Sequence, residues 1–280
     1  MEKEKLDKIL ENHKLWLNDE GGACADLKGA DLKGVDLRGI NLRYANLRNT
    51  DLYSANLRGA DLRYTHLRYA DLRGADLRSA DLRYADLRNT DLNHTKLYDA
   101  DLSGANLRYA NLYDADLKNT NLRNTDLYSA DLRGADLNSA DLRGANLYDI
   151  DLRGANLYDA NLTDIKTNIH TIGYNLACPE EGSFIAYKKA KDCIIKLLIL
   201  EDSKRSSATS IKCRCDKAKV LDIEKIDTGE KVESISSSRD NDFIYKVGEI
   251  VKVDDFDENR WNECSTGIHF FMNKQNAIKY

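Results

Sequence analysis

Leucine occupies every fifth position from Leu27 to Leu162, which makes 28 consecutive repeats of five residues. This period fits neither regular element of secondary structure. On an α-helix successive leucines would rotate by about 140° and spread around the axis, and on a continuous β-strand an odd spacing would place them on alternate faces. Each repeat must therefore combine a short extended piece with a bend, so that every Leu points toward one common interior.

The other positions of the repeat divide into inside, outside and corner. The residue two before each Leu is Ala, Thr, Val or Ile, and we expect it to point inward. The residues directly before and after Leu should point outward. The former is Asp or Asn except at His66 and Lys96, and the latter is mostly Arg, Lys or Tyr. The residue two after Leu is often Gly, Ser, Asn or Asp, which are turn residues.

The outward residues indicate four repeats per coil. Tyr44, Tyr64 and Tyr84 recur at intervals of twenty, as do Arg48, Arg68, Arg88 and Arg108. A coil of four repeats has a square cross-section, and 28 repeats make seven such coils. At a strand spacing of ~4.8 Å the rod would be roughly 34 Å long, and parallel crossovers favour a right-handed winding.

The run of A-[DN]-L-x-x repeats resembles the pentapeptide repeat family. The resemblance implies a right-handed quadrilateral β-helix. It also implies one possible target, because known members include quinolone-resistance proteins that resemble DNA in shape and charge and bind DNA gyrase. The charges of the repeats give little support to gyrase as a target. Residues 25–165 carry 19 basic and 22 acidic side chains, and only residues 96–165 are clearly acidic, with a net charge of −5.

The outward charges are expected to balance each other. Acidic and basic columns lie two residues apart along each face, so a lattice of exposed ion pairs is the simplest interpretation, and a polyanion-binding face is the alternative. The tyrosine column at positions 44, 64 and 84 should stack on itself between coils. Its alternative is a surface that binds single-stranded nucleic acid together with Arg.

The segment before the repeats has helical spacing. In LDKILENHKLWL the apolar side chains and His13 recur at intervals of three and four. This predicts a helix within residues 1–24 that caps the first coil, because an open coil end leaves backbone groups unpaired. A helix that binds a partner is the alternative.

After Ile165 the five-residue period ends, and residues 166–280 are expected to form a small α+β domain. Strands are predicted within 184–200, around a turn at 188–192, and within 211–223 and 242–253, followed by a strand and a short helix at 267–280. GSFIAYKK, KRSSAT, KCRC and RWNECSTGIHFF resemble an uncharacterised domain appended to bacterial and phage pentapeptide repeat proteins. The predicted fold is thus mainly β, in three parts: 1–24, 25–165 and 166–280.

The irregular polar stretches of the terminal domain hold the candidate interaction residues. These are Lys188, Arg205, Ser206, Ser207, Cys264 and His269. The stretch KRSSATSIK, residues 204–212, places hydroxyls beside bases and could hold an anion, although a polar loop between strands is the simpler interpretation. An enzyme would need Cys264, His269, Lys188 or Arg205 to converge in one pocket.

No metal or cofactor is expected. Six cysteines without a signal peptide indicate free thiols in a reducing cytoplasm. Cys213 and Cys215 should share one face of a strand, but the paired short spacings of zinc sites are missing. The chain carries no phosphate-binding loop, dinucleotide fingerprint or HExxH motif, so catalysis is not expected either.

Net charge and hydropathy set the expected partners. The chain has 42 basic and 47 acidic residues, a net charge of −5, which gives no general attraction to nucleic acid or acidic membranes. No stretch of 18 apolar residues could span a membrane. We expect a cytoplasmic, non-enzymatic scaffold in which a rigid rod displays the terminal domain to a protein partner.

Three alternatives stay open. The first is a DNA-mimicking gyrase binder, and the second is an enzymatic or anion-binding activity in the terminal domain. The third concerns assembly: a homodimer could form through an end of the rod or through the terminal domain.

Overall fold

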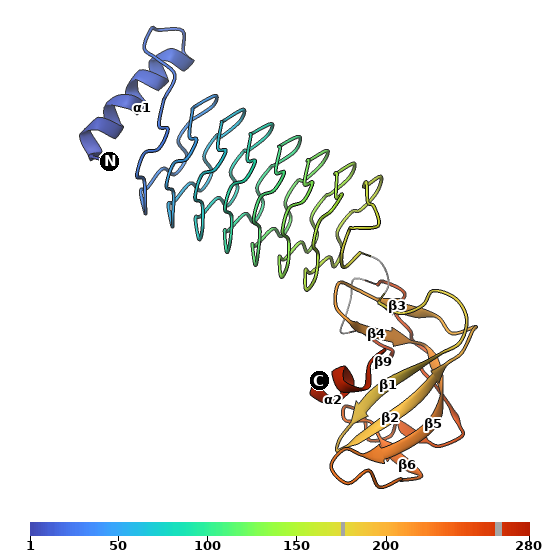
Figure 1. Cartoon of the computed structure of the whole chain (residues 1–280). Helices are drawn as coiled ribbons and strands as arrows, with labels where there is room; N and C mark the ends of the chain where they lie inside the picture. Colours follow the sequence, from blue (N-terminus) through green and yellow to red (C-terminus); the bar gives the residue numbers. More distant parts are fainter. Residues whose placement is uncertain (175–176, 261–264) are drawn as a thin grey trace. The chain divides into compact units, whose positions relative to one another are not determined.

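The computed structural model describes residues 1–174, 177–260 and 265–280. They form two compact units, residues 1–172 and residues 173–280 (Figure 1). The first unit holds the N-terminal helix and the repeats, and the second is a small β-rich domain.

The first unit begins with helix α1, Lys3–Leu17, as the helical spacing predicts. Leu6 and His13 are its buried residues. The backbone N–H of Ala25, at the start of the first repeat, donates a 3.1 Å hydrogen bond to Nδ1 of His13. Burial lowers the pKa of His13, so the imidazole is neutral and can accept that bond. The helix is therefore fixed to the first coil by a buried histidine.

The repeats are joined by a regular ladder of parallel bridges. Each bridge links residues twenty positions apart, beginning with Asp26 and Asn46 and continuing to Asn146 and Lys166. Between coils, the N–H after each outward acid or amide donates to a carbonyl of the next coil, as from Leu27 to Asn46 at 2.8 Å. One further bridge joins Asp151 to Ile172, one residue out of register. Figure 1 shows the chain winding through these coils.

The interior of the rod is a stack of leucines. Every repeat Leu from Leu27 to Leu157 is at most 3% exposed, and Leu162 is half-buried. Threonine replaces Ala at some inward positions without an unpaired hydroxyl, as where Thr50 donates to the carbonyl of Leu27 at 2.8 Å. The corner residue two after each Leu adopts a φ between +51° and +74° wherever a positive φ occurs, which explains the abundance of Gly, Asn and Asp there.

The second unit is built on an antiparallel sheet of seven strands in the order β3-β4-β9-β1-β2-β5-β8. In chain order its strands are β1 Phe184–Ala190, β2 Cys193–Ile199, β3 Arg205–Ser207, β4 Lys212–Cys215, β5 Lys217–Lys225, β8 Ile250–Lys252 and β9 Ile268–Phe271. A separate pair is formed by β6 Ser234–Ser236 and β7 Ile244–Lys246. Helix α2, Lys274–Lys279, follows β9 and packs with Phe271 and Ile194 on the opposite face from the main core.

Two local predictions for this unit need correction, and one feature was not predicted. The turn between β1 and β2 is only Lys191 and Asp192, with Lys191 at φ +54°, so positions 188–190 belong to β1. Positions 205–207, expected in a loop, form strand β3 because they pair with β4. The charged side chains of β4 are buried as well as its thiols: Arg214 is 2% exposed.

Candidate functional site

Lys188 is half-buried on the core face of β1 in the terminal domain. Its neighbours along β1, Ala186 and Ala190, belong to the main apolar cluster, and its ammonium sits 5.8 Å from the centre of the Tyr245 ring. Nζ donates to the backbone carbonyl of His269 at 3.3 Å. Burial lowers the pKa of Lys188 to about 8. A lysine with a lowered pKa can act as a base or a nucleophile, but the side chain of Lys188 lies on the core face of the sheet.

Arg205, at the start of β3, is occupied by the backbone of its own domain. Its guanidinium donates to the carbonyls of Ser203, Pro179, Gly182, Leu200 and Glu201 at 2.7–3.2 Å. It also lies over the Phe184 ring at 5.3 Å. These bonds use all five N–H groups of the guanidinium. Arg205 therefore ties two loops together, and a ligand would have to displace those bonds.

The two serines of β3 are buried. The Ser207 hydroxyl accepts from the N–H of Ala177 at 2.8 Å. The Ser206 hydroxyl has no hydrogen-bond partner among the described residues. His269 lies half-buried on β9 opposite Arg214, and Cys264 lies outside the described residues. The predicted interaction residues thus do not form one group.

The cysteines of the domain are core residues. Cys178, Cys193, Cys213 and Cys215 are each at most 5% exposed and belong to the main apolar cluster. Burial raises the pKa of Cys215 above its usual range, which keeps it a thiol. Within residues 1–174, 177–260 and 265–280, no group of three or more His, Cys, Asp or Glu could hold a metal ion.

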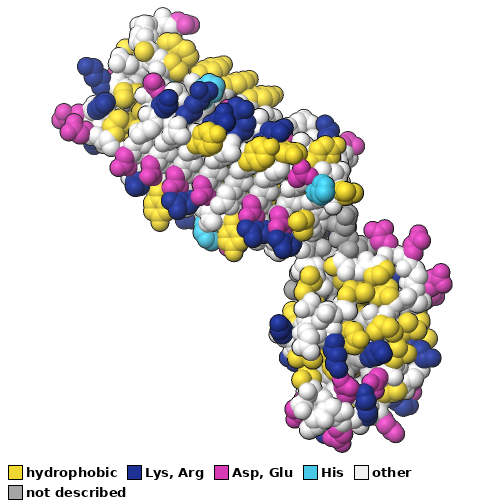
Figure 2. All heavy atoms as spheres, in the orientation of Figure 1, with side chains coloured by type: hydrophobic (Ala, Val, Ile, Leu, Met, Phe, Trp, Pro, Cys, Tyr) yellow, Lys and Arg dark blue, Asp and Glu magenta, His cyan; other side chains and the backbone are white. Residues whose placement is uncertain are grey.

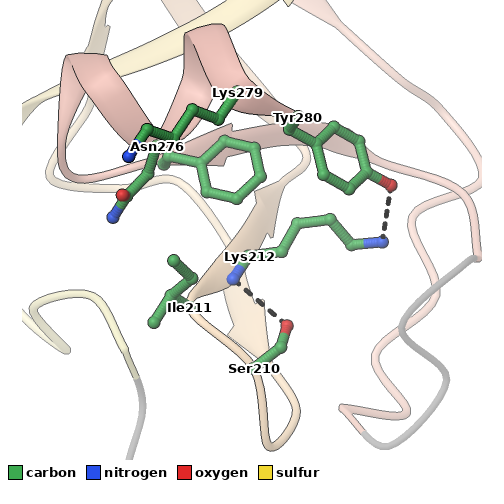
Figure 3. Close-up of a pocket in the computed structure, with 7 residues that line it drawn as sticks. Ser210, Ile211, Lys212, Asn276, Lys279 and Tyr280 are labelled. Atoms are coloured by element: carbon green, nitrogen blue, oxygen red, sulfur yellow. Dashed lines mark hydrogen bonds between the residues drawn. The ribbon is translucent and has the colours of Figure 1, made fainter. Parts of the chain in front are cut away.

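An open pocket lies where the N-terminal end of β4 meets helix α2 (Figure 3). Its volume is about 430 Å³, and its lining consists of Ser210, Ile211, Lys212, Phe271, Asn276, Lys279 and Tyr280. The side chain of Lys212 runs beneath the ring of Tyr280 in Figure 3, with its ammonium 3.4 Å from the phenol oxygen and 5.4 Å from the ring centre.

The pocket combines a cation with an apolar wall. Lys212 is only 9% exposed, and among the described residues its ammonium makes no ion pair. A second lysine, Lys279, also lines the pocket, and Phe271 supplies an apolar surface. This arrangement suits an anionic group attached to an apolar body. Lys212 closes the stretch KRSSATSIK, so the predicted anion-binding segment does contain a suitable cation, but at its end and not at Arg205.

On the rod, acidic and basic side chains pair within the repeat. In nine repeats the Arg after Leu makes an ion pair of 2.5–2.7 Å with the Asp before it. The hydrogen bond from Arg73 lowers the pKa of the Asp71 carboxyl. Some pairs also connect coils, as between Arg63 and Asp81 at 3.3 Å. Figure 2 shows acidic and basic side chains in neighbouring rows along the repeats.

The tyrosine column stacks on itself as predicted. The rings of Tyr44, Tyr64 and Tyr84 follow each other at 5.2 Å with interplanar angles of 9° and 12°. Trp16 of α1 meets Tyr44 edge-on at 6.2 Å. At the other end the Tyr84 ring lies against Gly104, where a Cβ would be 2.5 Å from the ring. The column therefore runs from the N-terminal helix to Gly104.

Sequence reasoning missed two features of these surfaces. The pocket is formed by β4 and α2, which lie more than fifty residues apart, and no local pattern indicates that contact. The second feature is the burial of Lys188, which alternation with Ala186 and Ala190 could have indicated.

The parallel ladder and the leucine interior define a repeat protein with a β-helix fold. Five overlapping segments, together spanning residues 23–166, match the family model for pentapeptide repeats. The chain therefore belongs to the pentapeptide repeat family. Residues 174–277 match a second model, a family of unknown function (DUF5758). No curated protein matches the chain.

Several solved pentapeptide repeat structures are similar to this chain. HetL, involved in heterocyst differentiation regulation in the cyanobacterium Nostoc, is 38% identical over 51% of this chain and 70% of its own, with a TM-score of 0.25. A protein of the Arabidopsis thaliana thylakoid lumen is 35% identical over 34% of this chain and 70% of its own, with a TM-score of 0.30. QnrB1, a plasmid-mediated fluoroquinolone resistance protein, is 20% identical over 51% of this chain and 86% of its own, with a TM-score of 0.30.

Proposed function

We propose that the chain is a non-enzymatic scaffold for protein–protein interaction, in which a rigid rod displays a terminal recognition domain. The observation that carries the proposal is the pairing of charge on the rod. Nine Asp–Arg pairs within single repeats neutralise their own charges. Each exposed pair is worth only ~0–1 kcal/mol, so the lattice chiefly keeps most of the rod soluble and inert.

The rod of the proposal is a right-handed quadrilateral β-helix of seven coils over residues 25–165. The twenty-residue spacing of the bridges supports four sides per coil. Residues 1–24 would cap the first coil, which the bond between Ala25 and His13 supports. Residues 166–280 would form the displayed domain. A rod of this kind is stiff because each coil is bonded to the next along its whole length.

The terminal domain is proposed as the recognition element because its surface is irregular and contains the Lys212 pocket. The buried ammonium of Lys212 and the neighbouring Lys279 would receive an acidic group of the partner. The same observation supports a second candidate function, the binding of a small anion in this pocket. The interaction roles of Lys188, Arg205, Ser206, Ser207, Cys264 and His269 stay predictions.

An enzymatic role for the terminal domain has less support. Lys188 lies on the core face of the sheet beside Ala186 and Ala190, whereas His269 alternates with the core residues Ile268 and Phe270 and so lies on the other face. The guanidinium of Arg205 is committed to five backbone carbonyls. These three side chains therefore do not converge on one pocket.

The gyrase alternative requires a rod whose outward acidic side chains are not paired with basic side chains. In this chain the paired arginines remove much of that charge. If the chain were a gyrase binder, micromolar protein would inhibit DNA supercoiling by gyrase. We expect supercoiling to be unchanged, and inhibition would replace the scaffold proposal with DNA mimicry.

The scaffold proposal also includes a cytoplasmic location and leaves the homodimer open. No helix among the described residues is long and apolar enough to cross a membrane. Sedimentation of the purified chain would establish whether a dimer forms, and a dimer lost on removal of residues 173–280 would place its interface in the terminal domain.

The scaffold proposal is tested by affinity capture from native lysate. The bait is either the full chain or the chain lacking residues 173–280, which keeps the first unit whole, and bound proteins are quantified by mass spectrometry. The expected result is a set of partners captured by the full chain and lost with the deletion. Capture of the same partners by the truncated chain would show that recognition lies on the rod.

A further inference from the structure

One face of the rod departs from the pairing of acid and base. The Arg column consists of Arg48, Arg68, Arg88 and Arg108, one from each of four successive coils. In three of these repeats the position before Leu, elsewhere usually Asp, is held by Asn46, His66 or Asn106. Only Arg88 has an acid in its own repeat, Asp86 at 2.7 Å.

The members of the Arg column are stacked by the backbone of the coils. The N–H of Asn49 donates to the carbonyl of Arg68 at 3.1 Å, and the N–H of Asn89 donates to that of Arg108 at 3.0 Å. The backbones of adjacent members are thus one strand spacing apart, about 4.8 Å. The column therefore concentrates positive charge along one line, and an anion placed along it would be attracted to several arginines at once.

The column has few counter-charges within the protein. No ion pair involves Arg48 or Arg68 among the described residues, and Arg108 approaches Asp126 at 3.5 Å. On the neighbouring face Arg43 and Arg123 also follow an Asn, but Arg63 and Arg83 between them pair with their own Asp at 2.5 and 2.6 Å. The whole-chain charge of −5 averages over these faces, and so it hides a locally basic strip.

Exposed tyrosines accompany the column. Tyr69 and Tyr109 stand at the corner after Arg68 and Arg108 and are 50% and 51% exposed. The guanidinium of Arg68 lies 4.7 Å from the centre of the Tyr69 ring, and that of Arg108 lies 5.8 Å from Tyr109. The Arg68 guanidinium also donates to the Tyr69 hydroxyl at 2.8 Å, and the Tyr109 ring meets Tyr128 edge-on at 5.6 Å. Each ring therefore has an arginine at one face, and both are separate from the stacked Tyr44 column.

We propose that the Arg column, with Tyr69 and Tyr109, binds single-stranded nucleic acid. The guanidinium groups would contact successive phosphates, for which their bidentate geometry is suited. The exposed rings would stack on unpaired bases, the combination typical of sequence-tolerant single-strand binding. A duplex hides the faces of its bases, and an acidic peptide would use the arginines and leave the tyrosines without a role.

The test measures binding of fluorescein-labelled oligothymidylate to the full chain by fluorescence anisotropy at several salt concentrations. The column variant is Arg48→Gln with Arg68→Gln. Its matched control is Arg63→Gln with Arg83→Gln, which removes two arginines that are paired with Asp. The expected result is binding by the wild type, a loss of about tenfold or more in the column variant, and a salt slope shallower by roughly 1.4. The control should stay within about twofold.

A third variant separates nucleic acid from other polyanions. Tyr69→Leu with Tyr109→Leu should weaken oligothymidylate about tenfold and leave inorganic polyphosphate of similar charge unaffected. Circular dichroism confirms that each variant is folded. The proposal is overturned if the wild type does not bind, if the control loses as much affinity as the column variant, or if the tyrosine variant binds both probes like the wild type.

Discussion

Gly104 is the position where the structure makes a sharp prediction about a single methyl group. A Cβ at this residue would lie 2.5 Å from Cε1 and 2.7 Å from Cδ1 of Tyr84. Gly59 is its matched control, because its φ of +66° is close to the +68° of Gly104 and no atom lies within 4 Å of its Cβ position. Substitution by Ala costs the same backbone strain at both sites, and only Gly104→Ala displaces the ring.

The extra cost at Gly104 can be estimated from the ring it moves. Tyr84 must shift away from its stack on Tyr64, where the centroids are 5.2 Å apart. Overpacking of this kind costs about 1–3 kcal/mol, and an aromatic pair is worth about 0.5–1.5 kcal/mol. Because Tyr84 is 57% exposed and can move, we expect the lower part of that range, about 1 kcal/mol beyond Gly59→Ala.

The assay is urea unfolding of the full chain followed by circular dichroism, with the free energy of unfolding of the rod compared among variants. A double-mutant cycle with Tyr84→Ala isolates the contact. In the Tyr84→Ala background, Gly104→Ala and Gly59→Ala should cost the same. The reasoning fails if the two glycine variants are equal in the wild-type background, or if the extra cost survives removal of Tyr84.

Three further predictions concern the core, the helix and the buried lysine. Leu82→Ala, at a fully buried position, should cost about 3–5 kcal/mol, and half-buried Leu162→Ala should cost clearly less; equal costs in urea unfolding would contradict the leucine interior. The lowered pKa of His13 means that the unfolded state binds its proton more readily, so attachment of α1 should weaken as pH falls below about 6.5, and an unchanged fluorescence of Trp16 would refute this. Burial lowers the pKa of Lys188 to about 8, so between about pH 8 and 10.5 only the unfolded state holds the proton, and the free energy of unfolding should rise with pH. Lys188→Met should raise the Tm at pH 7, and a lower Tm would contradict the cost of this partly buried cation.

The rod could be predicted closely because its information is local. The five-residue period specifies which side chains point inward, and the residue two positions after each Leu bends the chain. The interval of twenty between Tyr44 and Tyr64 indicates which residue is the neighbour in the next coil. Each of these relations involves residues within one coil of each other. The stacking of tyrosines and the pairing of Asp71 with Arg73 follow from the same register.

The terminal domain could be predicted only in outline, because several of its contacts join residues that are far apart in the chain. Strand β3 pairs with β4 in a short hairpin, with Ser206 opposite Arg214. Strand β4 in turn pairs with β9, where Arg214 lies opposite His269, and no local pattern encodes that distant partner. The same pairing buries the charged side chains of β4 and brings Lys212 beside Tyr280 to form the pocket. Polar residues expected in a loop thus became sheet residues, and a lysine outside the candidate set lines the pocket.

In the scaffold proposal the terminal domain recognises the partner while most of the rod supports it. Cross-linking mass spectrometry of the native complex, captured with the full chain and treated with an amine-reactive cross-linker, tests this directly, since both parts carry lysines. We expect partner cross-links to Lys279 or to other exposed lysines of residues 173–280. Cross-links confined to Lys33, Lys96 and Lys118 of the rod would contradict it.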